Sequence, residues 1–116
     1  MAFGFEDLNV YRKAIEFVNW IYSVTKSYPK DELFGLVSQL RRAAVSISLN
    51  IAEGFARSKK DFARFLDMAR GSVFECVTIL NISVKQNYMS SKQFTLLESE
   101  LVELSKMLSG LKKSLS

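Results

Sequence analysis

The last quarter of the sequence carries apolar side chains in a seven-residue repeat, and only a helix places such a row on one side of the backbone. The members of the repeat are Phe94, Leu97, Leu101, Leu104, Leu108, Leu111 and Leu115. The whole chain has only five glycines and one proline, Pro29, which is too few for the turns of a many-stranded sheet. Four long helices need just three turns, so the sequence predicts an all-α protein.

Turn and capping signals place the first two helices. The first is expected over residues 7–27, with Asp7 or Asn9 as its cap, and it stops before Pro29 because a proline restrains the preceding residue from helical angles. The second is expected over residues 31–55, up to the polar turn that follows.

The other two helices begin with capping boxes. Ser58 with Asp61 opens a helix over residues 58–87, and Ser90 with Gln93 opens the helix that carries the seven-residue repeat. Because the connections are short, neighbouring helices should be antiparallel, which predicts an up-down-up-down four-helix bundle.

Each of the first three helices has an apolar row that we expect to be buried. These rows are Leu8, Tyr11, Ala14, Ile15, Val18, Ile21 and Tyr22; then Leu33, Leu36, Leu40, Ala43, Ala44, Ile47 and Ile51; then Phe62, Phe65, Leu66, Ala69, Val73, Cys76, Val77 and Leu80. Gly71 is an exception in mid-helix. It costs about 1 kcal/mol relative to alanine, so either a helix approaches closely there or the site tolerates it.

The first two helices carry more apolar surface than the core of one bundle needs. The additional side chains are Phe17, Trp20, Val24, Phe34, Val45 and Leu49. We predict that they form an interface between copies of the chain, although large residues on a small bundle can also widen its own core.

A polar row runs between the apolar rows of the second helix. Its central members are Arg42, Ser46, Asn50 and Glu53. Two interpretations remain open: a partly buried network that fixes helix register or subunit packing, or a stripe exposed to water.

Composition argues against catalysis. The chain has no histidine, the commonest general base, and its single cysteine, Cys76, has no histidine or second cysteine with which to hold a metal. No glycine-rich phosphate-binding motif is present. We therefore expect a single domain over residues 1–116 without catalytic residues, metal or cofactor. The start lacks a signal-peptide pattern and no long apolar stretch follows, so we expect a cytoplasmic protein without membrane contact.

The formal net charge of +4 favours acidic partners only weakly. Its densest cluster lies in the turn before the third helix and contains Arg57, Lys59, Lys60 and Arg64. A helix start also offers backbone amides to anions, so this turn is a candidate site for the phosphates of RNA or DNA. The simpler alternative is a solvated turn. Two basic pairs elsewhere have less support, namely Arg12 with Lys13 and Lys112 with Lys113.

Four segments carry a resemblance to a known family. The run FGLVSQLRRAAVSISLNIAEG over residues 34–54 closely resembles the signature of the family named for the 23S ribosomal RNA intervening-sequence protein. FEDLNVYRKA over residues 5–14, YPKDE over residues 28–32 and FLDMARGS over residues 65–72 resemble its opening, first turn and third helix.

The resemblance implies a homo-oligomeric, pentameric four-helix bundle without known enzymatic activity. It also implies a relationship to accessory proteins of diversity-generating retroelements, which bind nucleic acid, and an architectural role for Arg41, Arg42, Asn50 and Glu53. The family name refers to the position of a gene within an inserted rRNA segment and does not imply ribosome binding.

Two functional hypotheses follow. The first is a non-enzymatic homo-oligomer that binds RNA or DNA weakly and without sequence specificity through repeated basic patches. The second is a protein-protein scaffold or adaptor whose charge serves only solubility. A small-molecule site within the bundle or on an oligomer axis is a third option that the sequence neither indicates nor excludes.

Overall fold

The computed structural model describes all 116 residues and contains helices but no strand. The four long helices are α1 (Asn9–Thr25), α2 (Leu36–Phe55), α3 (Lys59–Lys85) and α4 (Ser91–Ser114). Two short 3-10 helices, η1 (Gly4–Asp7) and η2 (Lys30–Glu32), precede α1 and α2. The prediction of an all-α fold is confirmed.

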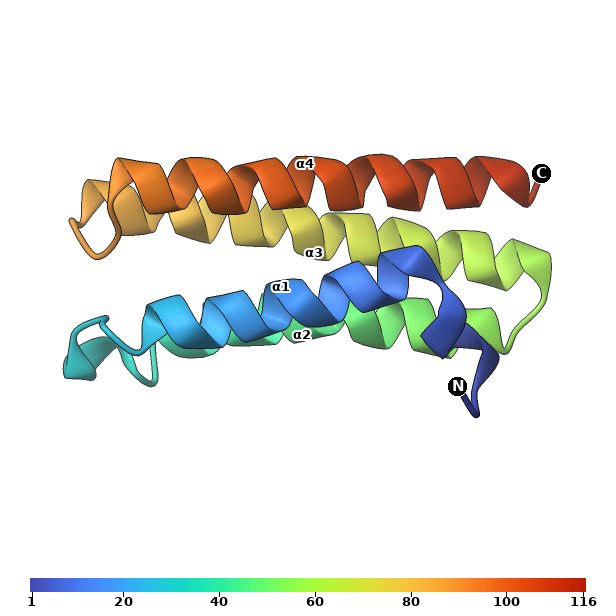
Figure 1. The fold of residues 1–116 in the computed structure, drawn as a ribbon, viewed down its shortest axis with the longest axis horizontal. Helices are drawn as coiled ribbons and strands as arrows, with labels where there is room; N and C mark the ends of the chain where they lie inside the picture. The colour runs from blue at the N-terminus through green and yellow to red at the C-terminus, as the bar shows by residue number, and fades with distance from the viewer.

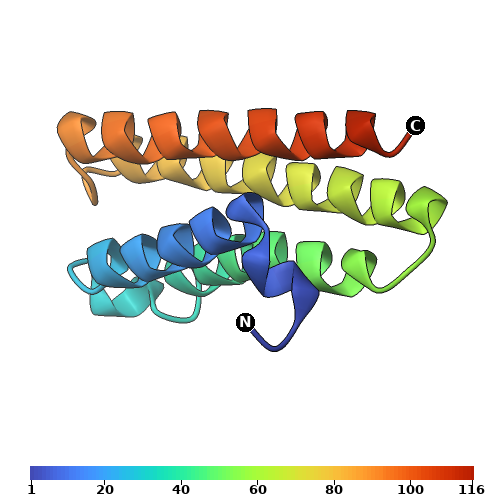
Figure 2. The ribbon, with the colours of Figure 1, turned by 45° about the vertical axis from the view of Figure 1, so that its right-hand side comes forward.

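Consecutive helices run in opposite directions, so the molecule is an elongated bundle of 42 × 23 × 21 Å (Figure 1). In both views α1 lies beside α2 and α3 lies beside α4 (Figure 2). The start of α3 and the end of α4 therefore lie at the same end of the bundle, together with both chain termini (Figure 1). None of these helices combines the length and apolar character needed to span a membrane.

Both predicted serine caps form, but only Ser90 with Gln93 makes a complete capping box, because the Asp61 side chain accepts no hydrogen bond from the backbone of Ser58. Ser58 Oγ accepts a hydrogen bond of 3.2 Å from the backbone N–H of Asp61, which lies in the first turn of α3. Ser90 Oγ accepts one of 3.1 Å from the backbone N–H of Gln93, whose side-chain oxygen in turn accepts from the backbone N–H of Ser90 at 3.1 Å. These bonds satisfy amides that have no partner within the helix, and they fix where α3 and α4 begin.

All four helices contribute to one core cluster of 23 buried residues. The expected rows of α3 and α4 are buried or pack against this cluster throughout. The largest side chains that are fully enclosed are Phe17, Ile21, Leu40, Ile47, Ile51, Leu66, Leu80, Leu101, Leu104 and Leu108.

The first helix differs from its prediction in both bounds and orientation. It begins at Asn9 after the extended residue Leu8, because the preceding residues form η1, and neither Asp7 nor Asn9 caps it. Its buried row is Val10, Ala14, Phe17, Ile21 and Thr25. The row is rotated from the predicted one because α1 packs against both α2 and α4.

Two residues expected in that row, Ile15 and Tyr22, are consequently 39% and 42% exposed. Phe17, which we predicted at an interface between copies, is only 1% exposed. That prediction is wrong for Phe17, because its side chain is enclosed by its own chain.

The second helix begins five residues later than expected. The 3-10 turn η2 and Gly35, which has φ −112° and ψ −108°, interrupt the helical path, and Glu32 Oε1 accepts a hydrogen bond of 3.2 Å from the backbone N–H of Leu36. Leu33 lies in this interruption and is 46% exposed, so its assignment to the core is wrong.

Candidate functional site

The basic turn is held at the surface between α2 and α3. Arg57, Lys59, Lys60 and Arg64 are all exposed. Two of them flank the ring of Phe65: the guanidinium carbon of Arg57 lies 4.8 Å from the ring centroid and that of Arg64 lies 5.2 Å away. Arg64 Nη2 also lies 3.4 Å from Asp61 Oδ1. The arginines are thus oriented by local contacts, whereas neither lysine forms an ion pair.

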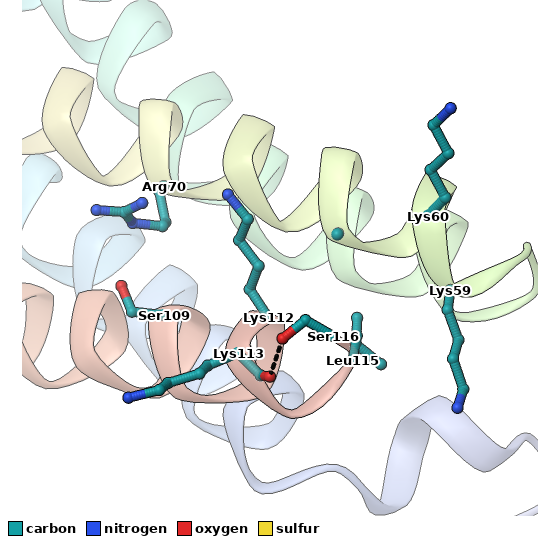
Figure 3. Close-up of a pocket in the computed structure, with 9 residues that line it drawn as sticks. Lys59, Lys60, Arg70, Ser109, Lys112, Lys113, Leu115 and Ser116 are labelled. Carbon is teal, nitrogen blue, oxygen red and sulfur yellow. Dashed lines mark hydrogen bonds between the residues drawn. The ribbon is translucent and has the colours of Figure 1, made fainter.

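The two lysines line a groove together with residues from the other end of the chain. Lys59 and Lys60 of α3 and Lys112 and Lys113 of α4 line one open groove with a volume of about 660 Å³. Lys59 and Lys60 point away from each other, while Lys112 extends from α4 toward α3 (Figure 3). The antiparallel pairing of α3 and α4 therefore joins two basic segments that the sequence separates.

Arg70 lies further along the same groove, and Asp67 links it to α4. Lys112 Nζ donates to both carboxylate oxygens of Asp67, at 2.9 and 2.8 Å, and Arg70 Nη1 lies 3.7 Å from Asp67 Oδ1. The Asp67 and Lys112 side chains are 47% and 40% exposed, so water screens this pair and its net stabilisation is small. Its effect is to hold two cations at the groove.

Charge is distributed unevenly along the bundle. Residues 55–70 and 106–116, which form this end of α3 and α4, contain eight lysines and arginines but two acidic residues, a net charge of +6. The first thirteen residues, also at this end, add two cations and two anions. Since the whole chain carries +4, all residues outside 55–70 and 106–116 together carry −2. The modest overall charge conceals a strongly basic end.

The predicted polar row is only partly a network. Asn50 Nδ2 donates to Ser46 Oγ at 3.1 Å, and Ser72 Oγ of α3 donates to Ser46 Oγ at 2.9 Å, so Ser46 connects α2 with α3. Arg42 and Glu53 are exposed and form no hydrogen bond or ion pair, so these two do not belong to the network within one chain.

Arg41, beside that row, has the clearer architectural role. Its Nε donates to Thr25 Oγ1 at 3.0 Å, and its guanidinium lies 4.4 Å from the ring centroid of Tyr22. These contacts tie α2 to α1.

The remaining predicted interface residues lie on two different surfaces. Trp20, 42% exposed, and the half-buried Val24 line a groove between α1 and α4 with Leu96. Phe34, 93% exposed, lies with Val45 and Leu49 on the outer side of α2.

The outer surface of α2 continues onto α3. This continuation was not predicted from the sequence. Arg42 and Ser46 border both the depression around Phe34 and a second one that includes Glu75. Glu75 in turn borders a third depression with Gly71, Phe74 and Ile82. We call this continuous surface the outer α2–α3 face.

Phe74 and Ile82 on the outer α2–α3 face are 55% and 42% exposed. A Cβ added to Gly71 would meet nothing within 4 Å, so no packing within the chain requires this glycine. The alternative of a close helix approach within the bundle is therefore excluded for Gly71. Phe74 and Ile82 lie at helical spacing beside the exposed Gly71, and this pattern in the sequence could have predicted the surface.

Buried and titratable groups provide no further site. Burial raises the pKa of the Cys76 thiol to about 12, so the thiolate that reacts or binds metal is scarce at neutral pH. No group of three or more acidic, cysteine or histidine side chains is arranged to hold a metal ion.

Comparison with known proteins gives the chain its family. The family model for the 23S rRNA-intervening sequence protein matches residues 6–110. A crystal structure from Bacteroides thetaiotaomicron, described as a protein with unknown function from the S23 ribosomal protein family, is similar with a TM-score of 0.82 and 25% sequence identity, over 90% of this chain and 98% of that one. No curated protein matches the sequence significantly. With nearly its whole length matched, the chain belongs to the 23S rRNA-intervening sequence protein family.

Proposed function

We propose that this protein is a non-enzymatic homo-oligomer that binds RNA or DNA weakly and without sequence specificity through its basic end. The observation that carries the proposal is the charge of +6 over residues 55–70 and 106–116, within a chain of +4. Phosphate contacts supply most sequence-independent binding. Phe65, the ring that Arg57 and Arg64 flank, is buried and offers no platform for base stacking, so the contacts that we propose for these arginines are to the backbone.

Self-association is supported by the outer α2–α3 face. Phe34, Leu49 and Phe74 are each more than half exposed, and a monomer gains nothing from leaving such large apolar side chains in water. Arg42 and Glu75 lie between them without ion-pair partners in their own chain, and they provide complementary charges for a second copy.

Assembly would multiply a weak basic patch. In a ring with cyclic symmetry the subunits are related by rotation about one axis, so every basic end takes an equivalent position relative to that axis. A pentamer in which each subunit neutralises two phosphates engages about ten, and its affinity then falls steeply with salt.

The test of nucleic-acid binding is a titration of labelled RNA and DNA of mixed sequence at low and at physiological salt. The double variant Lys59→Glu with Lys60→Glu should abolish binding. The matched control is Lys85→Glu with Lys92→Glu, because these exposed lysines lie at the opposite end of α3 and α4 and the change in net charge is identical. Absence of wild-type binding at low salt, or equal loss in both variants, would refute the proposal.

The test of assembly is light scattering after size exclusion. The wild type should elute as an oligomer, a pentamer in the form that the family resemblance implies, and Phe74→Glu should shift it to smaller species. A single monomer mass at high concentration would remove the multivalency argument.

A protein-protein scaffold is the second candidate. Phe34 favours it, since its side chain is 93% exposed at the end of the bundle opposite the basic one. This function predicts a specific protein partner that remains bound after nuclease treatment and is lost in Phe34→Ser.

A further inference from the structure

The groove between the start of α3 and the end of α4 joins cations that no single segment of the sequence contains. We propose that this groove is the track for the sugar-phosphate backbone, and that Arg70, Lys112 and Lys113 bind it together with Lys59 and Lys60. The inference rests on the proposed nucleic-acid function and locates it across two helices rather than in the turn.

The α3 wall of the groove is a single helical stripe. Lys60, Ala63 and Arg70 line it at spacings of three and seven, and Asp67 lies between them on the same face. Ten residues of helix span about 15 Å, which corresponds to roughly four or five phosphates along one strand. Lys60 and Arg70 lie at the two ends of this stripe. A linear polyanion is long enough to contact both, whereas a free phosphate would occupy only part of the stripe.

The α4 wall carries cations and has no acidic residue of its own. Lys112 and Lys113 lie in the last turn of α4, and residues 104–116 contain no aspartate or glutamate. The short side chains of Ala63 and Ser109 leave the space between the walls open. A concave groove with charged walls admits a rod-shaped polyanion more readily than a flat anionic membrane.

One acidic side chain, Asp67, lies among the cations of the groove. Lys112 is held by Asp67, which is therefore the internal competitor of any phosphate in the groove. Removing the charge of Asp67 frees Lys112 and raises the net charge of this end by one, so the groove predicts a variant with tighter binding.

Binding is measured by fluorescence anisotropy with a single strand and a duplex of about 20 nucleotides, long enough to cover the groove. Lys112→Gln with Lys113→Gln should weaken binding about ten-fold at low salt and reduce the slope of log affinity against log salt by about two per engaged subunit. Asp67→Asn should tighten binding several-fold, because removing one negative charge has about the same effect as adding one cation. The matched control, Lys85→Gln with Lys92→Gln, should leave affinity within two-fold, roughly the effect of distant screened charges.

The outcomes separate this inference from the proposed function. If Lys59→Glu with Lys60→Glu abolishes binding while the Lys112 and Lys113 variant and Asp67→Asn leave it unchanged, the function stands and the two-helix track is wrong. If the wild type binds neither strand nor duplex, both fail.

Vesicles containing phosphatidylserine form the second arm. Binding to them in preference to nucleic acid, lost in the same Lys112 and Lys113 variant, would overturn the inference in favour of a membrane surface. Thermal unfolding of every variant provides the folding control, and a variant that melts as the wild type does reports binding alone.

Discussion

Two glycines within the helices should respond to alanine in opposite ways. Gly54 is buried where α2 meets α3, and a Cβ there would lie 2.6 Å from Phe65 Cβ and 2.8 Å from Phe62 Cδ1. Carbon atoms pack at about 3.5–4.0 Å, and Phe65 Cβ is fixed to the backbone, so the helices must separate. At Gly71 the added methyl meets nothing.

The magnitudes follow from overpacking and helix propensity. Separating α2 from α3 destabilises the fold by about 3 kcal/mol, the upper end of the range for overpacked cores. Alanine stabilises a helix by about 1 kcal/mol relative to glycine, which offsets part of this loss. Gly54→Ala should therefore destabilise the protein by about 2 kcal/mol and lower Tm by about 8 °C. Gly71→Ala gains the propensity term alone, about 1 kcal/mol, and should raise Tm by about 4 °C.

Thermal unfolding followed by circular dichroism measures both variants, at one low protein concentration because association raises Tm. A Tm for Gly54→Ala at or above that of the wild type would refute the close approach of α2 and α3. If Gly71→Ala raises Tm yet weakens assembly in light scattering, Gly71 lies in contact with a second copy.

Three further outcomes are expected. Ser90→Ala removes the cap of α4 and should cost about 1 kcal/mol in urea unfolding, whereas an unchanged midpoint would contradict the cap. Cys76, with its pKa raised to about 12 by burial, should react with a thiol reagent at about pH 8 only after unfolding. Lys13 Nζ lies 2.6 Å from Glu100 Oε2, and this hydrogen bond raises the pKa of Lys13 above 10.5. A raised pKa means that the contribution is fully present below pH 10.5 and is lost at higher pH, so Lys13→Met should reduce stability at neutral pH and make no difference in strong alkali.

Local signals in the sequence predicted the parts of the fold that depend on neighbours along the chain. Ser58 and Ser90 start their helices because the amides they bond lie three residues away, and the rows of α3 and α4 are buried as their spacing indicates. The predicted start of α2 was wrong, while its end at Phe55 was right. The turn of η2 and Gly35 interrupts the helix, and Tyr88 donates a hydrogen bond of 3.0 Å to Glu32 in this turn from a turn that is distant in sequence.

The row of α1 failed for a related reason. Periodicity defines a stripe on the helix but not which neighbours it meets, and packing against α2 and α4 together turned Phe17 into the core while Tyr22 turned outward. Additional apolar side chains on one helix can therefore belong either to the core or to an interface between copies, and only the neighbouring helices decide between the two. The same ambiguity does not affect Phe34, because no element of the chain covers the interrupted start of α2.

The basic groove could be predicted in outline but not in detail. Once α3 and α4 are taken as an antiparallel pair, the start of one must lie beside the end of the other, so Lys59 and Lys112 become neighbours across the hairpin. The contact from Lys112 to Asp67 requires more, because a slip of one helical turn moves α4 by about 5.4 Å and breaks a hydrogen bond of 2.8 Å. That register is set by the packing of the buried leucines of α4 against the mixed apolar row of α3. The charge pattern of the groove is thus a consequence of core packing, and a repacked core would alter binding without changing any charged residue.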